Sequence, residues 1–239
     1  MRTLLLFLIY IILAVALIPF LVFCYLAKRP RPLMAVGKWA IGLGQKILGI
    51  ELDVRRSGGI DDRSTYVFMP NHASFLDGPM LYMLIPQALL VILKKSLFRI
   101  PIVGQGMKVV GFVPVDRRHS GGGKKSIEKA VRLMGEKGFS FLIFPEGTRS
   151  LDGKLQPLRR GGFFLALEAR APIVPVAIDG AFEIMPKGRF FVRKGKIRVD
   201  FLDPVPVGGY SPGNISPLVE RIEKILLSNL GDTKQKPAT

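Results

Sequence analysis

The hydrophobic positions of this chain form one long block at its start and a series of short blocks after it. Residues 4–27 carry no charged side chain. As a helix they would measure about 36 Å, which exceeds the roughly 30 Å hydrocarbon core of a bilayer. Pro19 interrupts the block, so a kinked segment that dips into one leaflet is an alternative to a full span. The small-x-small triplet at residues 14–16 leaves a cleaved signal peptide as a third interpretation.

Basic residues follow the apolar block, and only Arg2 and the amino terminus precede it. This asymmetry predicts that the C-terminal side of the block faces the cytoplasm, at the inner membrane if the source is bacterial. Residues 34–50 then show helical periodicity, with Lys38 and Lys46 on the polar side. A core helix is one interpretation, but Trp39 and the lysines favour the bilayer interface. We therefore expect residues 1–50 to form a membrane-associating helical segment.

From residue 51 onward, short β-rich runs alternate with helical stretches. This pattern predicts an α/β domain with a mixed, largely parallel sheet flanked by helices, covering residues 51–230 and followed by a flexible tail at 231–239. The expected strands are residues 52–56, 65–69, 89–93, 111–115, 140–144, 173–178 and 197–202. The expected helices are residues 79–84, 125–137, 163–170 and 215–227.

Composition narrows the classes of partner. The 239 residues have a net charge of +17 and are 49% hydrophobic, which fits one anchoring segment and one domain. The charge suits anionic lipids or phosphate-bearing substrates. We expect no nucleic-acid partner, because no recognisable nucleic-acid-binding module is present. The single cysteine, Cys24, lies in the apolar block, so we expect neither a disulfide framework nor a metal site.

The first candidate for chemistry is the segment NHASFLDG at residues 71–78, which contains His72 and Asp77. On one regular helix these two side chains would point about 140° apart. Contact therefore requires the histidine to lie in a turn and the aspartate to lie near a helix start. An aspartate that accepts the Nδ1–H would leave Nε2 free to take a proton from a substrate hydroxyl. A histidine that merely fills the turn is the alternative.

The second candidate is the segment FPEGTRS at residues 144–150, which directly follows an apolar run. A strand that ends here would display polar side chains at the edge of the sheet where open α/β proteins bind ligands. Arg149 suits bidentate contact with a phosphate, and Gly147 lets backbone N–H groups approach the same anion. An ordinary turn after a strand is the alternative interpretation.

Together the two segments, about seventy residues apart, resemble the glycerolipid acyltransferase family that includes 1-acylglycerol-3-phosphate acyltransferase. Residues 111–117 and 173–178 are similar to two further blocks of that family, in the expected order. The resemblance spans about residues 50–205. Two departures stand out, because members often carry Glu where this chain has Ser96 and a lysine-rich sequence where it has residues 158–163.

The resemblance implies a general base, His72, that is oriented by Asp77. It also implies a set of residues that bind the phosphorylated glycerol backbone, namely Lys94, Arg117, Glu146, Gly147, Thr148 and Arg149. The implied reaction moves an acyl group from acyl-CoA or acyl carrier protein (acyl-ACP) to the sn-2 hydroxyl of lysophosphatidic acid, forming phosphatidic acid without a metal or cofactor. Another lysophospholipid or lyso-amino-lipid acceptor is an alternative, and so is a non-enzymatic membrane-binding protein.

Two features remain outside these motifs. His119 lies in a loop whose nearest acid in sequence is Asp116, and we expect it to be solvated. Residues 187–198 contain six basic residues around Phe190 and Phe191. This run is either a solvated hairpin or a second contact with anionic lipid headgroups. Nothing in the sequence predicts an oligomeric state.

Overall fold

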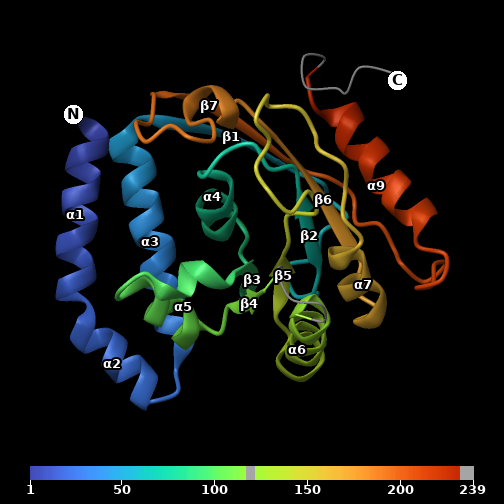
Figure 1. The fold of residues 1–239 in the computed structure, drawn as a ribbon, viewed down its shortest axis with the longest axis horizontal. Helices are drawn as coiled ribbons and strands as arrows, with labels where there is room; N and C mark the ends of the chain where they lie inside the picture. The colour runs from blue at the N-terminus through green and yellow to red at the C-terminus, as the bar shows by residue number, and fades with distance from the viewer. Residues whose placement is uncertain (117–121, 232–239) are drawn as a thin grey trace.

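The computed structural model describes residues 1–116 and 122–231, and in these residues the short hydrophobic runs form one seven-stranded sheet (Figure 1). The strand order is β1-β7-β6-β2-β5-β3-β4. The strands are β1 Ile50–Arg56, β2 Val67–Pro70, β3 Leu89–Lys94, β4 Val113–Val115, β5 Ser140–Leu142, β6 Ile173–Asp179 and β7 Gly195–Phe201. Each overlaps a predicted range, with boundaries shifted by up to two residues.

The sheet is parallel except where β6 and β7 pair antiparallel. The prediction of a mixed, largely parallel sheet is therefore confirmed. Because β2, β5, β3 and β4 run in the same direction, their carboxyl ends lie along one edge. The segments that follow these strands contain both candidate motifs.

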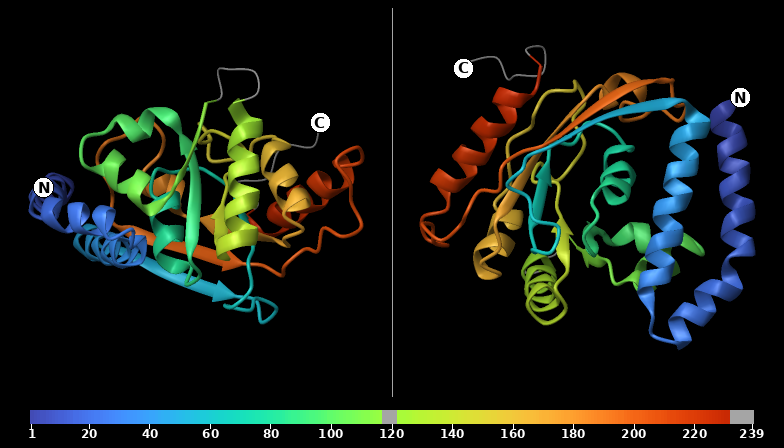
Figure 2. Two further views of the ribbon diagram at one scale, coloured as in Figure 1. Left: turned by 90° about the horizontal axis from the view of Figure 1, so that it is seen from below. Right: turned by 180° about the vertical axis from the view of Figure 1, so that it is seen from behind.

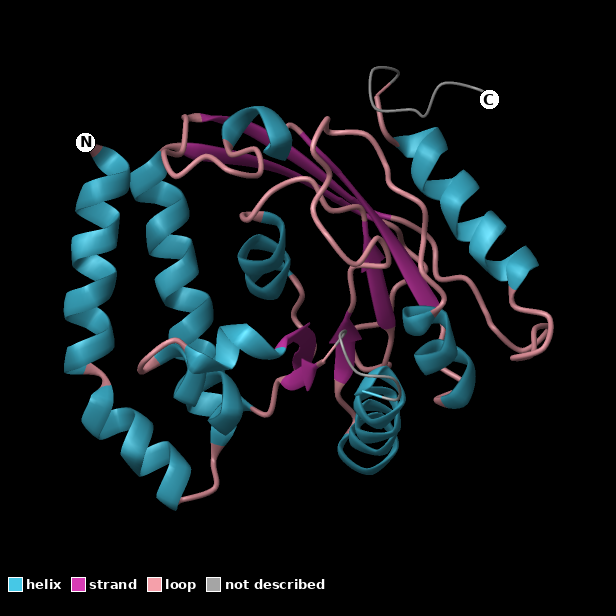
Figure 3. Cartoon of the chain, viewed as in Figure 1, coloured by secondary structure: helices cyan, strands magenta, loops and turns pink. Residues whose placement is uncertain are grey.

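Helices cover both faces of the sheet, with α6, α7 and α9 on one side and α4, α5 and the N-terminal helices on the other (Figures 1 and 3). Fully buried side chains between these layers, among them Phe68, Phe141 and Ile173, form the core. The helices of this domain are α4 Asp77–Leu84, η1 Lys95–Arg99, α5 Val103–Val110, α6 Gly122–Lys137, α7 Gly161–Glu168, α8 Ala181–Ile184 and α9 Ser216–Asn229.

The pattern of hydrophobic residues missed η1, α5 and α8. These helices are at most eight residues long, so each offers too few turns for a clear helical periodicity. The pair η1–α5 depends on a close backbone approach, because a Cβ at Gly104 would lie 2.4 Å from the carbonyl oxygen of Phe98. Glycine is the only residue that this contact admits.

The apolar block at the start forms two helices, α1 Arg2–Ala16 and α2 Ile18–Leu26, which are bent by 47° relative to each other. The break falls at Leu17, just before Pro19, which occupies the first turn of α2 where proline is tolerated. Among the described residues no single helix is long and apolar enough to cross a membrane. The bent pair satisfies that test only when its two helices are taken together, by length and composition.

The third helix, α3 Pro30–Leu48, confirms the predicted amphipathic helix and packs beside α1. The Tyr10 hydroxyl donates to the carbonyl of Ala40 at 2.9 Å. A Cβ at Gly44 would lie 2.1 Å from that hydroxyl, so this glycine lets the two helices approach. Figure 2 shows the helical pair standing beside the sheet.

The structure corrects one expectation for α3. Lys38 does not point to an interface, because its ammonium donates to the carbonyl of Ile85 at the end of α4. Trp39 on the same helix is exposed, as are many apolar side chains of α1. These side chains form the apolar face of α1: Leu4, Leu5, Phe7, Leu8, Ile11, Ile12 and Val15.

Candidate active site

The two residues of the first motif meet at the carboxyl end of β2. His72 lies in the turn after this strand, and Asp77 is the first residue of α4. The ring Nδ1 of His72 is 2.9 Å from Oδ2 of Asp77. The predicted contact between a histidine in a turn and an aspartate at a helix start is therefore confirmed.

The environment of Asp77 sets the tautomer of the ring. Its side chain is fully buried, and Oδ2 accepts the backbone N–H groups of Ala73 and Ser74 at 2.8 Å each. An oxygen that already accepts two N–H groups is an acceptor for the ring as well, so Nδ1 of His72 carries the proton. The lone pair on Nε2 then remains available to take a proton from a substrate.

Phe144 fixes the plane of the histidine ring. The two ring centroids are 3.8 Å apart with an interplanar angle of 27°, which is a stacked arrangement. The side chain of His72 is 18% exposed, so it is held on one face and remains reachable from solvent. The ring is thus restrained by a hydrogen bond and by stacking.

The second motif also holds the backbone of His72. The carboxylate of Glu146 accepts the N–H of His72 with Oε1 and the N–H of Gln156 with Oε2. The N–H of Ser150 donates to the carbonyl of His72 at 2.8 Å. Residues 144–150 therefore hold, by hydrogen bonds, the two peptide groups on either side of His72.

Glu146 was expected to face the acceptor, but its side chain is turned inward and is 2% exposed. Burial raises the pKa of this carboxyl to about 8, and the nearby carboxylates of Asp77 and Asp152 act in the same direction. The two backbone N–H groups that it accepts lower the pKa and offset only part of this rise. Burial thus favours the protonated form of Glu146 well above the usual range of a carboxyl pKa.

Two more polar residues, which were not among the expected site residues, connect the histidine turn to distant segments. The side-chain amide of Asn71 pairs with both backbone groups of Ile178, accepting its N–H at 2.7 Å and donating to its carbonyl at 2.9 Å. The hydroxyl of Ser74 donates to the carbonyl of Met185 at 2.8 Å. Both partners are more than a hundred residues away in sequence, so no local pattern could have revealed them.

The outward side of the second motif carries positive charge. The guanidinium of Arg149 lies 5.9 Å from the ring centroid of the exposed Phe75. The ammonium of Lys187 is 3.3 Å from Oγ1 of Thr148 and 3.5 Å from the carbonyl oxygen of Arg149. Lys187 was not among the expected site residues, and its only sequence signal was the basic run at residues 187–198.

Gly147 is required by the turn between these two sides. Its φ of +73° lies in the left-handed region, and a Cβ there would lie 3.0 Å from the side chain of Arg159. Its N–H donates to the carbonyl of Phe144 at 3.0 Å. This glycine N–H thus closes the turn, whereas the sequence had suggested that backbone N–H groups here approach an anion.

The remaining expected residues lie farther along the same sheet edge or outside the described chain. Lys94 is exposed at the carboxyl end of β3, and β5 separates that strand from β2. Arg117 follows β4 and lies outside the described residues, as does His119. Within the described ranges, no group of three or more His, Cys, Asp or Glu side chains could hold a metal ion.

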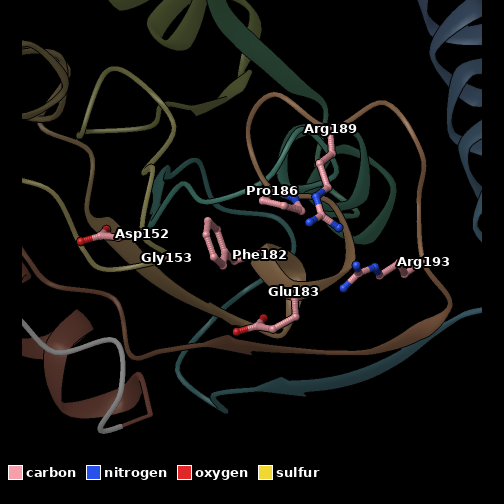
Figure 4. Close-up of a pocket in the computed structure, with 7 residues that line it drawn as sticks. All are labelled: Asp152, Gly153, Phe182, Glu183, Pro186, Arg189 and Arg193. Carbon is pink, nitrogen blue, oxygen red and sulfur yellow. The ribbon is translucent and has the colours of Figure 1, made fainter.

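A hollow of about 340 Å³ lies beside the loop that precedes β7, and neither His72 nor Asp77 lines it. Figure 4 shows the guanidinium groups of Arg189 and Arg193 directed into it. The carboxylates of Asp152 and Glu183 also line it, so its charge is mixed. An anionic ligand would meet both signs of charge there. The hollow is therefore not the site formed by His72 and Asp77.

Comparisons with known proteins agree with this geometry. The family model described as Acyltransferase matches residues 51–179. The 1-acyl-sn-glycerol-3-phosphate acyltransferase of Limnanthes douglasii is 33% identical over 199 residues, which cover 83% of this chain and 67% of the relative. The alpha form of that enzyme in Homo sapiens is 28% identical over 182 residues, covering 76% and 64%.

A solved structure is similar over nearly the whole fold. It is the crystal structure of the 1-acyl-sn-glycerophosphate (LPA) acyltransferase PlsC from Thermotoga maritima. The match has a TM-score of 0.76 and 26% identity, and it covers 94% of this chain and 91% of that one. The similarity thus extends beyond residues 51–179 to the N-terminal helices.

Proposed function

The chain belongs to the Acyltransferase family, and we propose that it transfers a fatty acyl group from a thioester donor to the sn-2 hydroxyl of lysophosphatidic acid, forming phosphatidic acid. The observation that carries the proposal is the geometry of His72 and Asp77 beside the cations of Arg149 and Lys187. The relatives and the solved structure that match most of the chain are named for this reaction.

His72 acts as the general base. Its Nε2 takes the proton of the acceptor hydroxyl while the hydroxyl oxygen attacks the thioester carbonyl carbon. The tetrahedral intermediate then collapses, the carbon–sulfur bond breaks, and the imidazolium returns its proton to the leaving thiolate. Asp77 stabilises the imidazolium through the Nδ1 hydrogen bond, as in the histidine–aspartate half of a serine hydrolase site. General base catalysis of this kind contributes about 10² to 10⁴ in rate.

Phe144, Glu146 and Ser150 are positioning residues. They contact the ring, the N–H and the carbonyl of His72 and none of them is aimed outward. Fixing the base before the substrates bind lowers the cost of reaching the reactive geometry. This assignment replaces the expected role of Glu146 as a direct contact to the acceptor.

Arg149 and Lys187 bind the phosphate of the acceptor. Arg149 presents a planar donor pair suited to two phosphate oxygens. Lys187, whose ammonium lies 3.5 Å from the backbone carbonyl oxygen of Arg149, brings a second positive charge to the same segment. The hydroxyl of Thr148, 3.3 Å from the Lys187 ammonium, is a further hydrogen-bond group. Lys94, which is exposed at the carboxyl end of β3, is a further proposed acceptor contact. The family resemblance adds Arg117, which lies outside the described residues.

The N-terminal helices place this site at a membrane whose lipids are the substrates. The apolar face of α1 is exposed along its length, and such a face gains free energy when it enters the bilayer. The catalytic domain then faces the cytoplasm, in keeping with the basic residues after α2. The thioester donor, acyl-CoA or acyl-ACP, reaches the site from the aqueous side.

The experiment is an acyl-transfer assay that crosses two donors, acyl-CoA and acyl-ACP, with several lyso-acceptors. We expect lysophosphatidic acid to be acylated with the highest kcat/KM, and we expect the rate of the His72→Ala enzyme to fall by about 10² to 10⁴. A higher kcat/KM for lysophosphatidylglycerol or for a lyso-amino-lipid would transfer the proposal to that acceptor. The donor series also decides which thioester carrier the enzyme uses.

A further inference from the structure

The loop of residues 186–194, which connects α8 to β7, exposes two adjacent phenylalanines. Phe190 is 53% exposed and Phe191 is 58% exposed. Their rings meet edge to face, with centroids 5.6 Å apart. Scattered apolar residues are normal on a protein surface, but adjacent aromatic side chains that form a patch mark an interaction site.

This patch is continuous with the apolar face of α1. The ring of Phe190 packs edge to face on Phe7, with centroids 6.1 Å apart. The N–H of Val192 donates to Oγ1 of Thr3 at 3.1 Å. In Figures 1 and 2 the loop before β7 lies beside the amino-terminal end of α1. A surface that covers the amino-terminal end of α1 would therefore also contact the loop of residues 186–194.

The charge around the patch is positive. Residues 184–199 contain six basic residues and no acidic one. Two of the six, Lys196 and Arg198, are held in ion pairs by aspartates of the sheet. Arg189 and Arg193 point back into the hollow of Figure 4. Lys187 and Lys194 are exposed, and each is three residues from a phenylalanine in the sequence. Apolar tips with basic flanks fit the surface of an anionic leaflet.

We propose that residues 186–194 form a second bilayer contact, adjoining that of the N-terminal helices, in which Phe190 and Phe191 enter the interface of an anionic leaflet. The inference rests on the proposed function, because it takes the acceptor to be a membrane lipid. It adds to that function a contact that the aromatic patch and its continuity with α1 support independently of the catalytic motifs.

The same loop touches the active site. The backbone of Pro186 forms a β-bridge with Ser74, two residues after His72. Lys187 reaches Thr148 and Arg149. The residues of the bilayer contact and those of the acceptor site are thus at most five residues apart on one loop. An acceptor molecule in the leaflet would therefore reach Lys187 close to the point where the acceptor leaves the bilayer.

The direct experiment measures the depth of a single tryptophan. In the full-length Trp39→Phe enzyme, Phe190→Trp reports on the loop, and Lys224→Trp reports on an exposed position of α9, at the far side of the molecule (Figure 1). The probes are phosphatidylglycerol vesicles that carry bromine on the acyl chains. We expect the tryptophan at 190 to shift to the blue and to be quenched several-fold more strongly than the one at 224.

Equal quenching at positions 190 and 224, in protein that floats with vesicles and transfers acyl groups, would overturn the loop contact and leave the proposed function intact. Quenching at 190 in an enzyme that does not acylate lysophosphatidic acid would keep the contact and remove the proposed function. A blue shift at 190 that grows with protein concentration in the absence of vesicles would assign the patch to a second copy of the chain instead.

A kinetic test uses the double substitution Phe190→Ser with Phe191→Ser. We expect KM for lysophosphatidic acid embedded in vesicles to rise about tenfold, because the loop no longer holds the site against the leaflet. The rate with a short-chain acceptor dissolved in water should not change. An equal loss with both acceptors would show that the phenylalanines support the fold or the site rather than the bilayer contact.

Discussion

The two sides of residues 144–150 perform different tasks. The inward side, with Phe144, Glu146 and Ser150, contacts the histidine turn and the loop around Gln156. The outward side, with Thr148 and Arg149, meets Lys187 and Phe75. A segment that the sequence presents as one substrate-binding motif is therefore divided between orienting the base and binding the acceptor. Substitutions on the two sides should change different kinetic constants.

We expect the largest effect from substituting His72, the residue that the inward side positions. His72→Ala removes the general base, so kcat should fall by about 10² to 10⁴. The side chain is partly exposed, and we expect thermal unfolding in detergent to remain close to that of the parent enzyme. Turnover at the parent rate by a folded variant would exclude the mechanism proposed above.

The second largest effect is expected from a substitution of Glu146, on the inward side. Above about pH 8, where Glu146 is ionised, Glu146→Gln replaces an acceptor oxygen with an amide group whose hydrogens face a backbone N–H, so either His72 or Gln156 loses its acceptor. A misplaced base of this kind costs about 10² in rate, and we expect that loss in kcat with the acceptor KM changed less than about twofold. Steady-state kinetics at several acceptor concentrations measure both constants. A change confined to KM would return Glu146 to the acceptor site.

Substitutions on the outward side should change the acceptor KM and leave kcat nearly unchanged. Arg149→Ala removes a charge-assisted phosphate contact, which is worth about 10- to 100-fold in affinity, so the acceptor KM should rise by that factor while kcat changes little. Arg149→Lys keeps the charge but loses the bidentate geometry, and should recover only part of the loss. A fall in kcat alone would place Arg149 with the positioning residues.

Lys187→Ala, also on the outward side, should raise the acceptor KM less than Arg149→Ala does. The ammonium is exposed and adds charge rather than a fixed pair of donors. We expect the acceptor KM to rise by about 2- to 5-fold, and the effect to depend on salt. The double variant with Arg149→Ala measures the coupling between the two cations. Additive losses would show that the two residues do not share one phosphate.

The smallest effect concerns stability. Because burial raises the pKa of Glu146 from 4.5 to about 8, the folded protein retains a proton that the unfolded chain releases. The stabilisation from this proton is complete below about pH 4.5 and is lost as pH rises through about 8. Glu146→Gln cannot titrate, so the unfolding temperature of the parent should fall relative to that of the variant between about pH 5 and about pH 9. Parallel curves would contradict the raised pKa.

The sequence predicted the strands, most of the helices and the contact between His72 and Asp77, because each depends on residues close in the chain. A turn followed by a helix start is visible in five residues. The inward orientation of Glu146 depends on the backbone of His72, which lies 74 residues away. The role of Lys187 depends on a β-bridge between its neighbour Pro186 and Ser74. Neither long-range contact leaves a local pattern.

The amide of Asn71 illustrates a consequence for folding. It bonds to Ile178, 107 residues along the chain, while Glu146 reaches back 74 residues to the same turn. Contacts of such separation form late, because closing long loops costs entropy before any bond is gained. The imidazole therefore acquires its working geometry only after β2, β5 and β6 have all assembled. Enzymatic activity during refolding should appear after secondary structure, and a chain released before β6 emerges should be inactive.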